Sequence, residues 1–405
     1  MDARHWGARR TAAVLSVAAL AATAACSSTA TTGSTASTSP SSPSPAGAST
    51  PADAVTSAAS STSAGGGGSP SASASTAGSS ADPAAGSVVP LAVYSAQGYD
   101  AVVTKAFTKA TGIPVKLTDD STGPLLTKVA AERNNPQWGV LWVDGDEAFA
   151  ALDKQGQLLP YTPTASFTAV GKALVPADRS FTPASTTAVP ALIYNAARVS
   201  AVPTSLPDLL GPAYRGKVGM NDPSQSGPTY PLIAGVMNQL GGQSGGVAGG
   251  EKYLTAMKAN GLQVFPTNGD TLHALETGRI EYGLIQSSAA AGEVAKAPKT
   301  AQFQAKVVYP PKSTLLPANL GIDKGASPAQ QAEAKKFIDY VLSPAGQKIM
   351  QTGDPSGDSL FWPVVSGVTA LPAAGPFPAA YQKLDPYFWG PLESQVNTFF
   401  DTTIK

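Results

Sequence analysis

The chain has 405 residues, with 27 basic and 27 acidic side chains and a formal charge of zero. This balance excludes the strongly basic surface of a nucleic-acid-binding protein and a polybasic membrane patch. The only cysteine is Cys26, which excludes an internal disulfide.

Residues 1–25 have the pattern of a secretory signal. Basic residues come first, the apolar run Ala12 to Ala22 follows, and small residues precede Cys26. The run is too short to cross about 30 Å of hydrocarbon. The sequence Thr23-Ala24-Ala25-Cys26 resembles the lipobox of bacterial lipoproteins, with Thr23 where Leu or Val is usual. The resemblance implies a lipidated Cys26 that anchors the protein to the outer face of the cell membrane. The alternative is an ordinary signal that happens to end near a cysteine.

Residues 26–87 consist almost entirely of Ser, Thr, Ala, Gly and Pro, with no aromatic residue, Leu, Ile or Met. Such a segment cannot bury enough apolar surface to offset the conformational entropy lost on folding. We expect a disordered tether, and about 60 residues of this kind reach roughly 40–45 Å. That reach would hold a folded domain away from the membrane.

Strand–loop–helix units begin near residue 88. The first is Leu91–Phe107, LAVYSAQGYDAVVTKAF, in which small polar residues separate an apolar run from apolar residues at helical spacing. Strands at Ile113–Leu117 and Val140–Val143 start two further units. Successive units of this kind predict a parallel sheet with right-handed crossovers. We assign residues 88–188 to the first part of lobe 1.

The pattern restarts after residue 188 and predicts a second lobe at 189–308, followed by a return to lobe 1 and C-terminal helices at 309–405. The fold class is therefore α/β with two lobes, each a mostly parallel sheet flanked by helices. Open α/β sheets bind ligands outside the carboxyl ends of their strands. The expected elements are strands at Ala188–Tyr194, Lys217–Met220, Tyr282–Ile285 and Ser313–Ile322, helices at Leu232–Leu240, Glu251–Asn260 and Pro328–Leu342, and a glycine-rich loop at Gly241–Gly250.

Several segments in this order resemble the ferric-type solute-binding proteins of bacterial ABC importers. They are VVPLAVYSAQGYD, the stretch from DDSTGPLL to QLLPYTP, LIYNAARV, RGKVGMNDPSQSGPTY and AEAKKFIDYVLSPAGQKIMQ. The resemblance covers nearly all of Val88 to about Val365. It implies a monomer with a two-lobed type II periplasmic-binding-protein fold, a small-molecule ligand between the lobes, and an ABC transporter permease as partner.

The resemblance also implies where iron would bind, and the chain departs from the family there. Ferric members place adjacent tyrosines after the strand that corresponds to Tyr282–Ile285, and often a histidine in the first loop. This chain has Gln286, Ser287 and Ser288 after that strand, and Ser95-Ala96-Gln97-Gly98 in the first loop. Because Fe³⁺ prefers anionic oxygen or imidazole ligands, we expect an oxyanion or organic solute such as a phosphonate or phosphate ester. Ferric iron or an iron chelate is the alternative.

The candidate contacts are hydroxyls, amides and glycines that follow predicted strands, several of them opening helices whose N–H groups favour anions. Each Ser or Thr also suits a helix cap, and Tyr194 suits a core. Asp144, Glu147 and Asp222 offer carboxylates to a cationic amine, which would suit an aminophosphonate. We expect no resident metal and no cofactor. The candidate ligand-binding residues are Ser95, Gln97, Ser121, Thr122, Gly123, Asp144, Tyr194, Asp222, Ser224, Ser226, Gly227, Gln286, Ser287 and Ser288.

One motif suggests an enzyme instead. Residues Gly242–Gly246 match the G-x-S-x-G pattern of a nucleophile elbow. An elbow lies between a strand and a helix, whereas this motif falls in the predicted glycine-rich loop after a helix. Its only candidate base beyond the signal segment is His273. We therefore expect a binding protein rather than an enzyme, with a secreted lipid-anchored hydrolase as the alternative from another class.

Overall fold

The computed structural model describes residues 88–355 and 357–405. Cys26 and the predicted signal and tether lie outside these residues. The first sheet starts with three strand–helix units, as the sequence predicts, and β1 pairs in parallel with both β2 and β3. These elements are β1 (Leu91–Ser95), α1 (Asp100–Thr111), β2 (Val115–Asp119), α2 (Thr122–Ala131), β3 (Val140–Asp144) and α3 (Asp146–Lys154).

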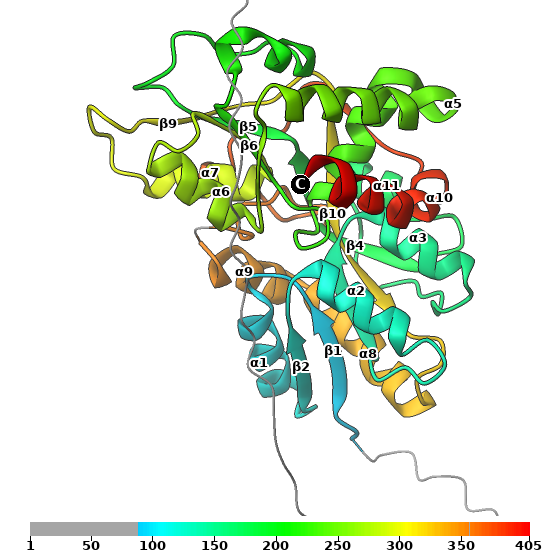
Figure 1. Ribbon diagram of the computed structural model, residues 1–405. Helices are drawn as coiled ribbons and strands as arrows, with labels where there is room; N and C mark the ends of the chain where they lie inside the picture. Colours follow the sequence, from blue (N-terminus) through cyan, green and yellow to red (C-terminus); the bar gives the residue numbers. More distant parts are fainter. Residues whose placement is uncertain (1–87, 356) are drawn as a thin grey trace, which may run out of the picture. The chain divides into compact units, whose positions relative to one another are not determined.

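Later segments complete the first sheet, whose order is β11-β10-β3-β1-β2 with β4 also on β10. Figure 1 labels β1, β2, β4 and β10 of this sheet. β10 runs antiparallel to β3 and β4, so the sheet is mixed rather than mostly parallel. Helices α8 and α9 return to this sheet, where Phe337 of α8 packs against Phe107 of α1. The added elements are α4 (Ala169–Leu174), β4 (Phe181–Val189), β10 (Ser313–Ile322), α8 (Pro328–Val341), α9 (Pro344–Gly353), η3 (Pro372–Ala374) and β11 (Tyr381–Gln382).

The second sheet has the order β7-β6-β8-β5-β9 and is also mixed. β6 is parallel to β7 and β8, whereas β5 is antiparallel to β8 and β9. Its elements are β5 (Ala191–Asn195), η1 (Leu206–Leu210), η2 (Pro212–Tyr214), β6 (Val218–Asn221), α5 (Thr229–Ala259), β7 (Gln263–Phe265), α6 (Asn268–Glu276), β8 (Tyr282–Ile285), α7 (Ser287–Lys296) and β9 (Ala305–Val308).

The single strand expected at Ala188–Tyr194 is wrong. β4 ends at Val189 in the first sheet and β5 begins at Ala191 in the second, so the chain changes sheets at Pro190. Proline has no N–H to donate to a strand ladder and interrupts pairing. Most of β4 was missed because its sequence, FTPASTTAV, is rich in small and polar residues although every one of them is buried.

The glycine-rich loop expected at Gly241–Gly250 is also wrong, because this segment is part of α5. The helix kinks at Gly242, with φ 61° and ψ −156°, and its second half packs back on the first. A Cβ at Gly246 would lie 2.4 Å from the Met237 carbonyl oxygen, and one at Gly250 would lie 2.2 Å from the Met237 side chain. The glycines therefore allow two helical segments to touch. The G-x-S-x-G motif lies inside this helix and not between a strand and a helix.

The C-terminal segment contacts elements of both sheets. Trp389 and Phe400 are fully buried in the same apolar cluster as Met237 of α5, and Tyr230 of α5 donates to the Trp389 carbonyl. Gly390 packs against the backbone of α3, where a Cβ would meet the Glu147 carbonyl oxygen at 2.3 Å. The segment comprises α10 (Pro386–Trp389), η4 (Gly390–Leu392), α11 (Glu393–Phe399) and η5 (Phe400–Ile404).

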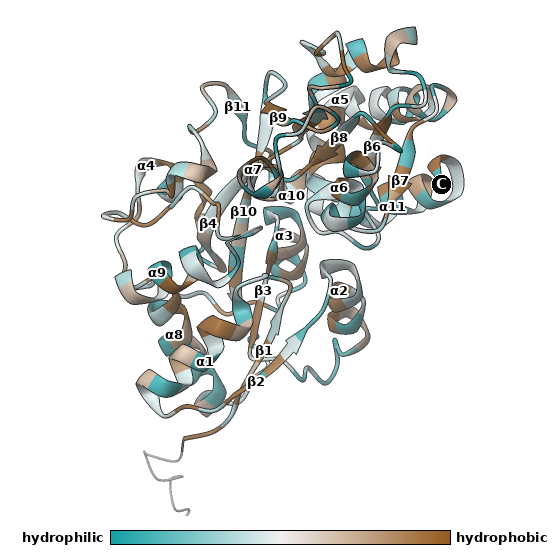
Figure 2. Cartoon of the chain, turned by 90° about the vertical axis from the view of Figure 1, so that its left-hand side faces the viewer, coloured by the Kyte–Doolittle hydropathy of each residue, from teal (hydrophilic) through white to brown (hydrophobic). Residues whose placement is uncertain are grey.

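Apolar side chains of the central strands form the core of each sheet. In the first, Trp142 of β3 is fully buried, with ring centroids 5.4 Å from Tyr99 and 6.0 Å from Phe337. Figure 2 shows β1 and β3 coloured as predominantly hydrophobic. Within the described part of the chain, no helix has the length and apolar character needed to cross a membrane. The predicted two-lobed α/β architecture is confirmed.

Candidate functional site

A cavity of about 160 Å³ lies where elements of the two sheets meet. It is small beside the roughly 300–1,000 Å³ of pockets for drug-sized ligands, so it suits a small solute. Most of its walls come from loops that follow strands of both sheets, and Asp358 comes from the segment after α9. The lining residues are Ala96, Ser121, Thr122, Asp144, Gln225, Ser226, Gly227, Pro228, Thr267, Asn268, Gly269, Gln286 and Asp358.

Four helices begin at the wall of this cavity. Ser121, Pro228, Thr267 and Gln286 stand at the N-caps of α2, α5, α6 and α7. The first N–H groups of a helix have no partner within it and carry a partial positive charge, so they favour an anion. Because the side chain of Ser121 makes no capping hydrogen bond, the cap interpretation does not account for this residue.

Two carboxyl groups line the same cavity. Asp144 Oδ1 accepts from Gln97 Nε2 at 3.0 Å, and Asp358 Oδ2 accepts from the Gly98 N–H at 2.8 Å. Burial, with the nearby Asp358 charge adding to it, raises the pKa of Asp144 to about 8. Burial also raises the pKa of Asp358 to about 6. The described lining contains no Lys, Arg or His.

Six of the fourteen candidate residues line the cavity, namely Ser121, Thr122, Asp144, Ser226, Gly227 and Gln286. Sequence reasoning missed Asp358 because it follows helix α9 rather than a strand. It also missed Asn268, which lies in the wall and donates to Gln286 Oε1 at 3.4 Å. The signal that was available for Asn268 is its position at the start of α6, shortly after β7.

Other candidates support the wall from behind. Ser95 is fully buried, and its hydroxyl accepts from the Gln97 N–H at 3.3 Å. Gln97 holds Asp144 and accepts from the Tyr99 hydroxyl at 2.8 Å. Ser287 Oγ accepts from the Ala188 N–H at 3.0 Å, which joins α7 to β4.

Tyr194 and Ser288 are buried and do not belong to the cavity lining. The Tyr194 ring stacks on Tyr282 with centroids 6.5 Å apart, inside the core of the second sheet. Ser288 lies in the first turn of α7, and its hydroxyl has no partner among the described residues. We therefore leave Tyr194 out of the site.

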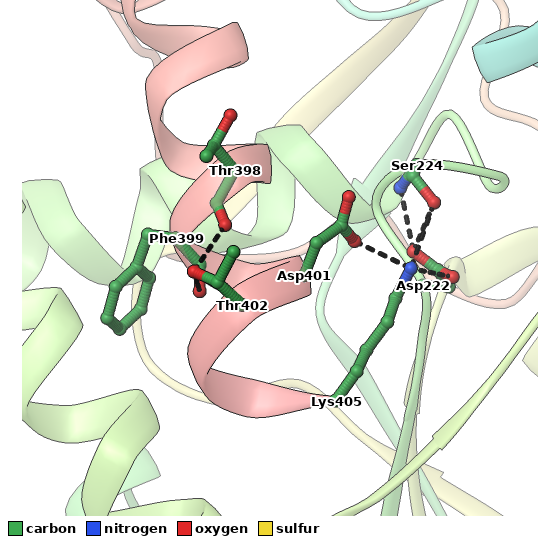
Figure 3. Close-up of polar contacts among 7 residues, drawn as sticks. All are labelled: Asp222, Ser224, Thr398, Phe399, Asp401, Thr402 and Lys405. Carbon is green, nitrogen blue, oxygen red and sulfur yellow. Dashed lines mark hydrogen bonds and ion pairs between the residues drawn. The ribbon is translucent and has the colours of Figure 1, made fainter.

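Asp222 and Ser224 face the C-terminal segment (Figure 3). Lys405 Nζ lies 2.5 Å from the Asp222 carboxylate and 2.6 Å from that of Asp401, and it donates to Ser224 Oγ at 3.1 Å. Asp222 Oδ1 in turn accepts from the N–H and the hydroxyl of Ser224, both at 2.8 Å. These contacts fix the start of loop 222–228, whose later residues line the cavity.

The two sheets touch across the cavity through glycines. The Gly123 N–H donates to the Gln225 carbonyl at 3.4 Å, and a Cβ at Gly123 would lie 2.0 Å from the Ser224 carbonyl oxygen. A Cβ at Gly227 would lie 2.3 Å from Thr122 Oγ1. At Gly123 the backbones of α2 and loop 222–228 leave no room for a side chain, and at Gly227 the Thr122 side chain fills the space. This is a closed arrangement of the two lobes.

A larger cavity of about 520 Å³ lies behind this contact, between α2, α3, loop 222–228 and α11. Gly123 and Ser224 line it together with Glu393, whose pKa burial raises to about 7. We place the solute in the smaller cavity because that one lies at the carboxyl ends of strands and at four helix N-termini.

The donor set of the site differs from what iron prefers. Within residues 88–355 and 357–405, no group of three or more His, Cys, Asp or Glu side chains is arranged to hold a metal ion. No tyrosine lines the 160 Å³ cavity. Its oxygen donors are hydroxyls, amides and the two carboxyls, which hydrogen-bond readily to an organic solute.

Comparison with known sequences gives a family and several relatives. A family model for bacterial extracellular solute-binding proteins matches residues 103–382. A periplasmic protein of Salmonella typhimurium, named for 2-aminoethylphosphonate binding, is 27% identical over 246 residues, which cover 60% of this chain and 68% of the relative. An Fe(3+)-binding periplasmic protein of Serratia marcescens is 26% identical over 288 residues, covering 65% of this chain and 77% of the relative.

Solved structures show the same fold. Iron-bound HitA from Pseudomonas aeruginosa superposes with a TM-score of 0.63 and 23% identity, covering 78% of this chain and 99% of that one. AfuA from Actinobacillus pleuropneumoniae, with fructose-6-phosphate bound, gives a TM-score of 0.65 and 19% identity over 78% of this chain and 98% of that one.

Proposed function

The chain belongs to the family of bacterial extracellular solute-binding proteins, the solute-capturing components of ABC-type importers, and we propose that its solute is a small organic oxyanion. The observation that carries the proposal is the convergence of four helix N-termini on a cavity of about 160 Å³. The two lobes would close on the solute, and its binding energy would favour the closed state. The relative named for 2-aminoethylphosphonate supports a phosphonate.

A thermal-shift screen of the purified protein tests the solute class. The panel contains phosphonates, phosphate esters, thiamine, polyamines and Fe³⁺-citrate. A ligand at a hundred times its dissociation constant stabilises the folded state by about 2.7 kcal/mol, so a phosphonate or phosphate ester should raise the melting temperature clearly. A shift with Fe³⁺-citrate alone would instead establish the iron alternative, which the Serratia marcescens relative favours.

We also propose that the protein has no catalytic activity. The family is one of binding proteins, and the G-x-S-x-G motif lies within α5 at its kink. His273 is exposed on α6, with 76% of its side-chain surface accessible, and its Nδ1 lies 3.9 Å from the Glu276 carboxylate. Turnover of an ester by the pure protein would contradict this proposal.

We further propose that Cys26 carries a lipid which anchors the protein to the outer face of the cell membrane. Cys26→Ser should move the protein from the membrane fraction into the medium, because the acylated side chain would be its only membrane attachment. Fractionation and immunoblotting measure the distribution, and Ser27→Ala is the matched control. Unchanged membrane association of the Cys26 variant would contradict the anchor.

A further inference from the structure

A lysine of the C-terminal segment contacts a loop that lines the 160 Å³ cavity. Loop 222–228 joins β6 to α5, and its residues 225–228 line that cavity. At the start of the loop, Lys405 Nζ lies 2.5 Å from the Asp222 carboxylate and donates to Ser224 Oγ at 3.1 Å (Figure 3). Because Lys405 belongs to neither sheet, a wall of the cavity is held in part from outside both sheets.

Asp222 organises the turn that leads to the cavity. Its Oδ1 accepts from the N–H and the hydroxyl of Ser224, and its main-chain carbonyl accepts from the N–H groups of Gln225 at 3.1 Å and Ser226 at 2.9 Å. The Asp222 side chain is only 13% exposed, and a carboxylate in such a position is costly without a counter-charge. Within residues 88–355 and 357–405, its one ion pair is with Lys405. The turn therefore depends on a charge that the C-terminal segment supplies.

The main chain that carries this lysine is itself held against α5. Ile404 is buried in the apolar cluster that α5 shares with the C-terminal segment, and Lys258 of α5 donates to the Lys405 carbonyl oxygen at 2.8 Å. A second acid, Asp401, lies 2.6 Å from Lys405 Nζ. Burial lowers the pKa of Lys405, but the hydrogen bonds to Asp222 and Asp401 outweigh burial and raise it above its ordinary value. The ammonium is thus a fixed charge at neutral pH.

We propose that Lys405 is a positioning residue for solute capture, whose ammonium neutralises Asp222 and holds loop 222–228 in the conformation that lines the cavity. This inference rests on the proposed function, because it takes the solute to lie against that loop. Without the ammonium, the Asp222 carboxylate would turn toward water and release its bonds to Ser224. The loop would then spend only part of its time in the binding conformation, and the apparent dissociation constant rises as that fraction falls.

Two substitutions at Lys405 test the inference. Lys405→Met keeps an unbranched apolar stem and removes the charge, whereas Lys405→Arg keeps the charge. Calorimetric titration with 2-aminoethylphosphonate at pH 7.5 should show about tenfold weaker binding in Lys405→Met, the loss expected when the loop is competent about a tenth of the time. Lys405→Arg should restore most of that affinity. In the ligand-free Lys405→Met protein, amide hydrogen exchange should become faster at residues 224–226 and stay unchanged in β6, a local effect that a general loss of stability does not produce.

A double-mutant cycle connects the effect to the ion pair. In an Asp222→Asn background, Lys405→Met should reduce the affinity no further, because the charge that the lysine neutralises is already absent. The matched control is Lys336→Met on α8. Lys336 also pairs with a largely buried acid, Glu333, at 3.2 Å, and both lie outside the cavity lining. This variant should bind 2-aminoethylphosphonate as wild type does.

Wild-type affinity in a folded Lys405→Met protein overturns this inference and leaves the oxyanion proposal standing. Weaker binding with faster exchange throughout the protein also overturns it, because the lysine would then serve overall stability. If wild-type protein binds Fe³⁺-citrate and not the phosphonate, the oxyanion proposal is overturned, and titration of the same variants with Fe³⁺-citrate decides the role of Lys405. Binding of neither probe by folded wild-type protein overturns both proposals. Lys405→Gln replaces Lys405→Met if the latter does not fold.

Discussion

Replacing Gly123 with alanine is expected to weaken solute binding about a hundredfold while the ligand-free protein stays as stable as wild type or gains stability. Gly123 is the second residue of α2, and alanine is favoured over glycine in a helix by about 1 kcal/mol. The added methyl group would nevertheless lie 2.0 Å from the Ser224 carbonyl oxygen in the closed arrangement. The atoms nearest to that methyl group belong to the backbone of loop 222–228, so no side chain can rotate away to relieve the clash. The variant should therefore hold the lobes apart.

The size of the effect follows from population shift. When the binding-competent closed state becomes a hundred times rarer, the apparent dissociation constant rises by the same factor. Calorimetric titration with the tightest solute of the screen measures it, and small-angle scattering should report a larger radius of gyration. Gly245→Ala is the matched control, because a Cβ there meets nothing within 4 Å. Wild-type affinity in Gly123→Ala would show that capture does not require this contact.

Acidifying the ligand-free protein from pH 8.5 to pH 5.5 is expected to raise its melting temperature by at least about 5 °C. Several acids are wholly or partly buried, and burial is the largest influence on the pKa of each. Burial, followed by the Asp146 charge, raises the pKa of Glu147 to about 8, and burial raises the pKa of Asp146 to about 6 and that of Glu393 to about 7. In the unfolded chain these carboxyls ionise near their ordinary pKa of about 4.

The sign follows from proton counting. Between pH 4 and the raised pKa of each group, the folded state holds more protons than the unfolded state, so stability falls as pH rises through that window. Glu147→Gln removes one contributor and should flatten the melting temperature between pH 5.5 and pH 8.5. The change Glu251→Gln should leave the slope as it is, because the partly exposed Glu251 is not among the charges that shift the pKa of these acids. A melting temperature that rises from pH 5.5 to pH 8.5 would refute the prediction.

The first three strand–helix units were predictable because local pattern and tertiary structure agree there. Each of β1, β2 and β3 is followed by a helix, and Gly112 ends α1 in the left-handed conformation that glycine adopts readily. The sequence pattern was misleading at residues 241–250, where the glycines allow close helix packing and do not form a loop. In α5, Gly246 and Gly250 allow two helical segments to touch at Met237, a tertiary contact that composition does not reveal.

The candidate site was also predictable only in part. Residues that directly follow strands and open helices, such as Ser121 and Gln286, line the cavity as that rule anticipates. Asp358 could not be found by it, because the aspartate follows a helix and meets Gly98 across 260 residues of sequence. Asp222 fits the rule, yet its carboxylate pairs with Lys405, a residue whose position depends on how the last helix packs.

The packing of the C-terminal segment determines which parts of the protein move together. Trp389 and Phe400 are buried with α5 beside the second sheet, while α10 and η4 pack on α3 of the first through Tyr387 and the buried Gly390. The segment therefore bridges the two sheets, and any separation of the sheets has to break one of these two contacts. A distance probe on α11 would show whether the last helices travel with the second sheet or stay with β1 and β3.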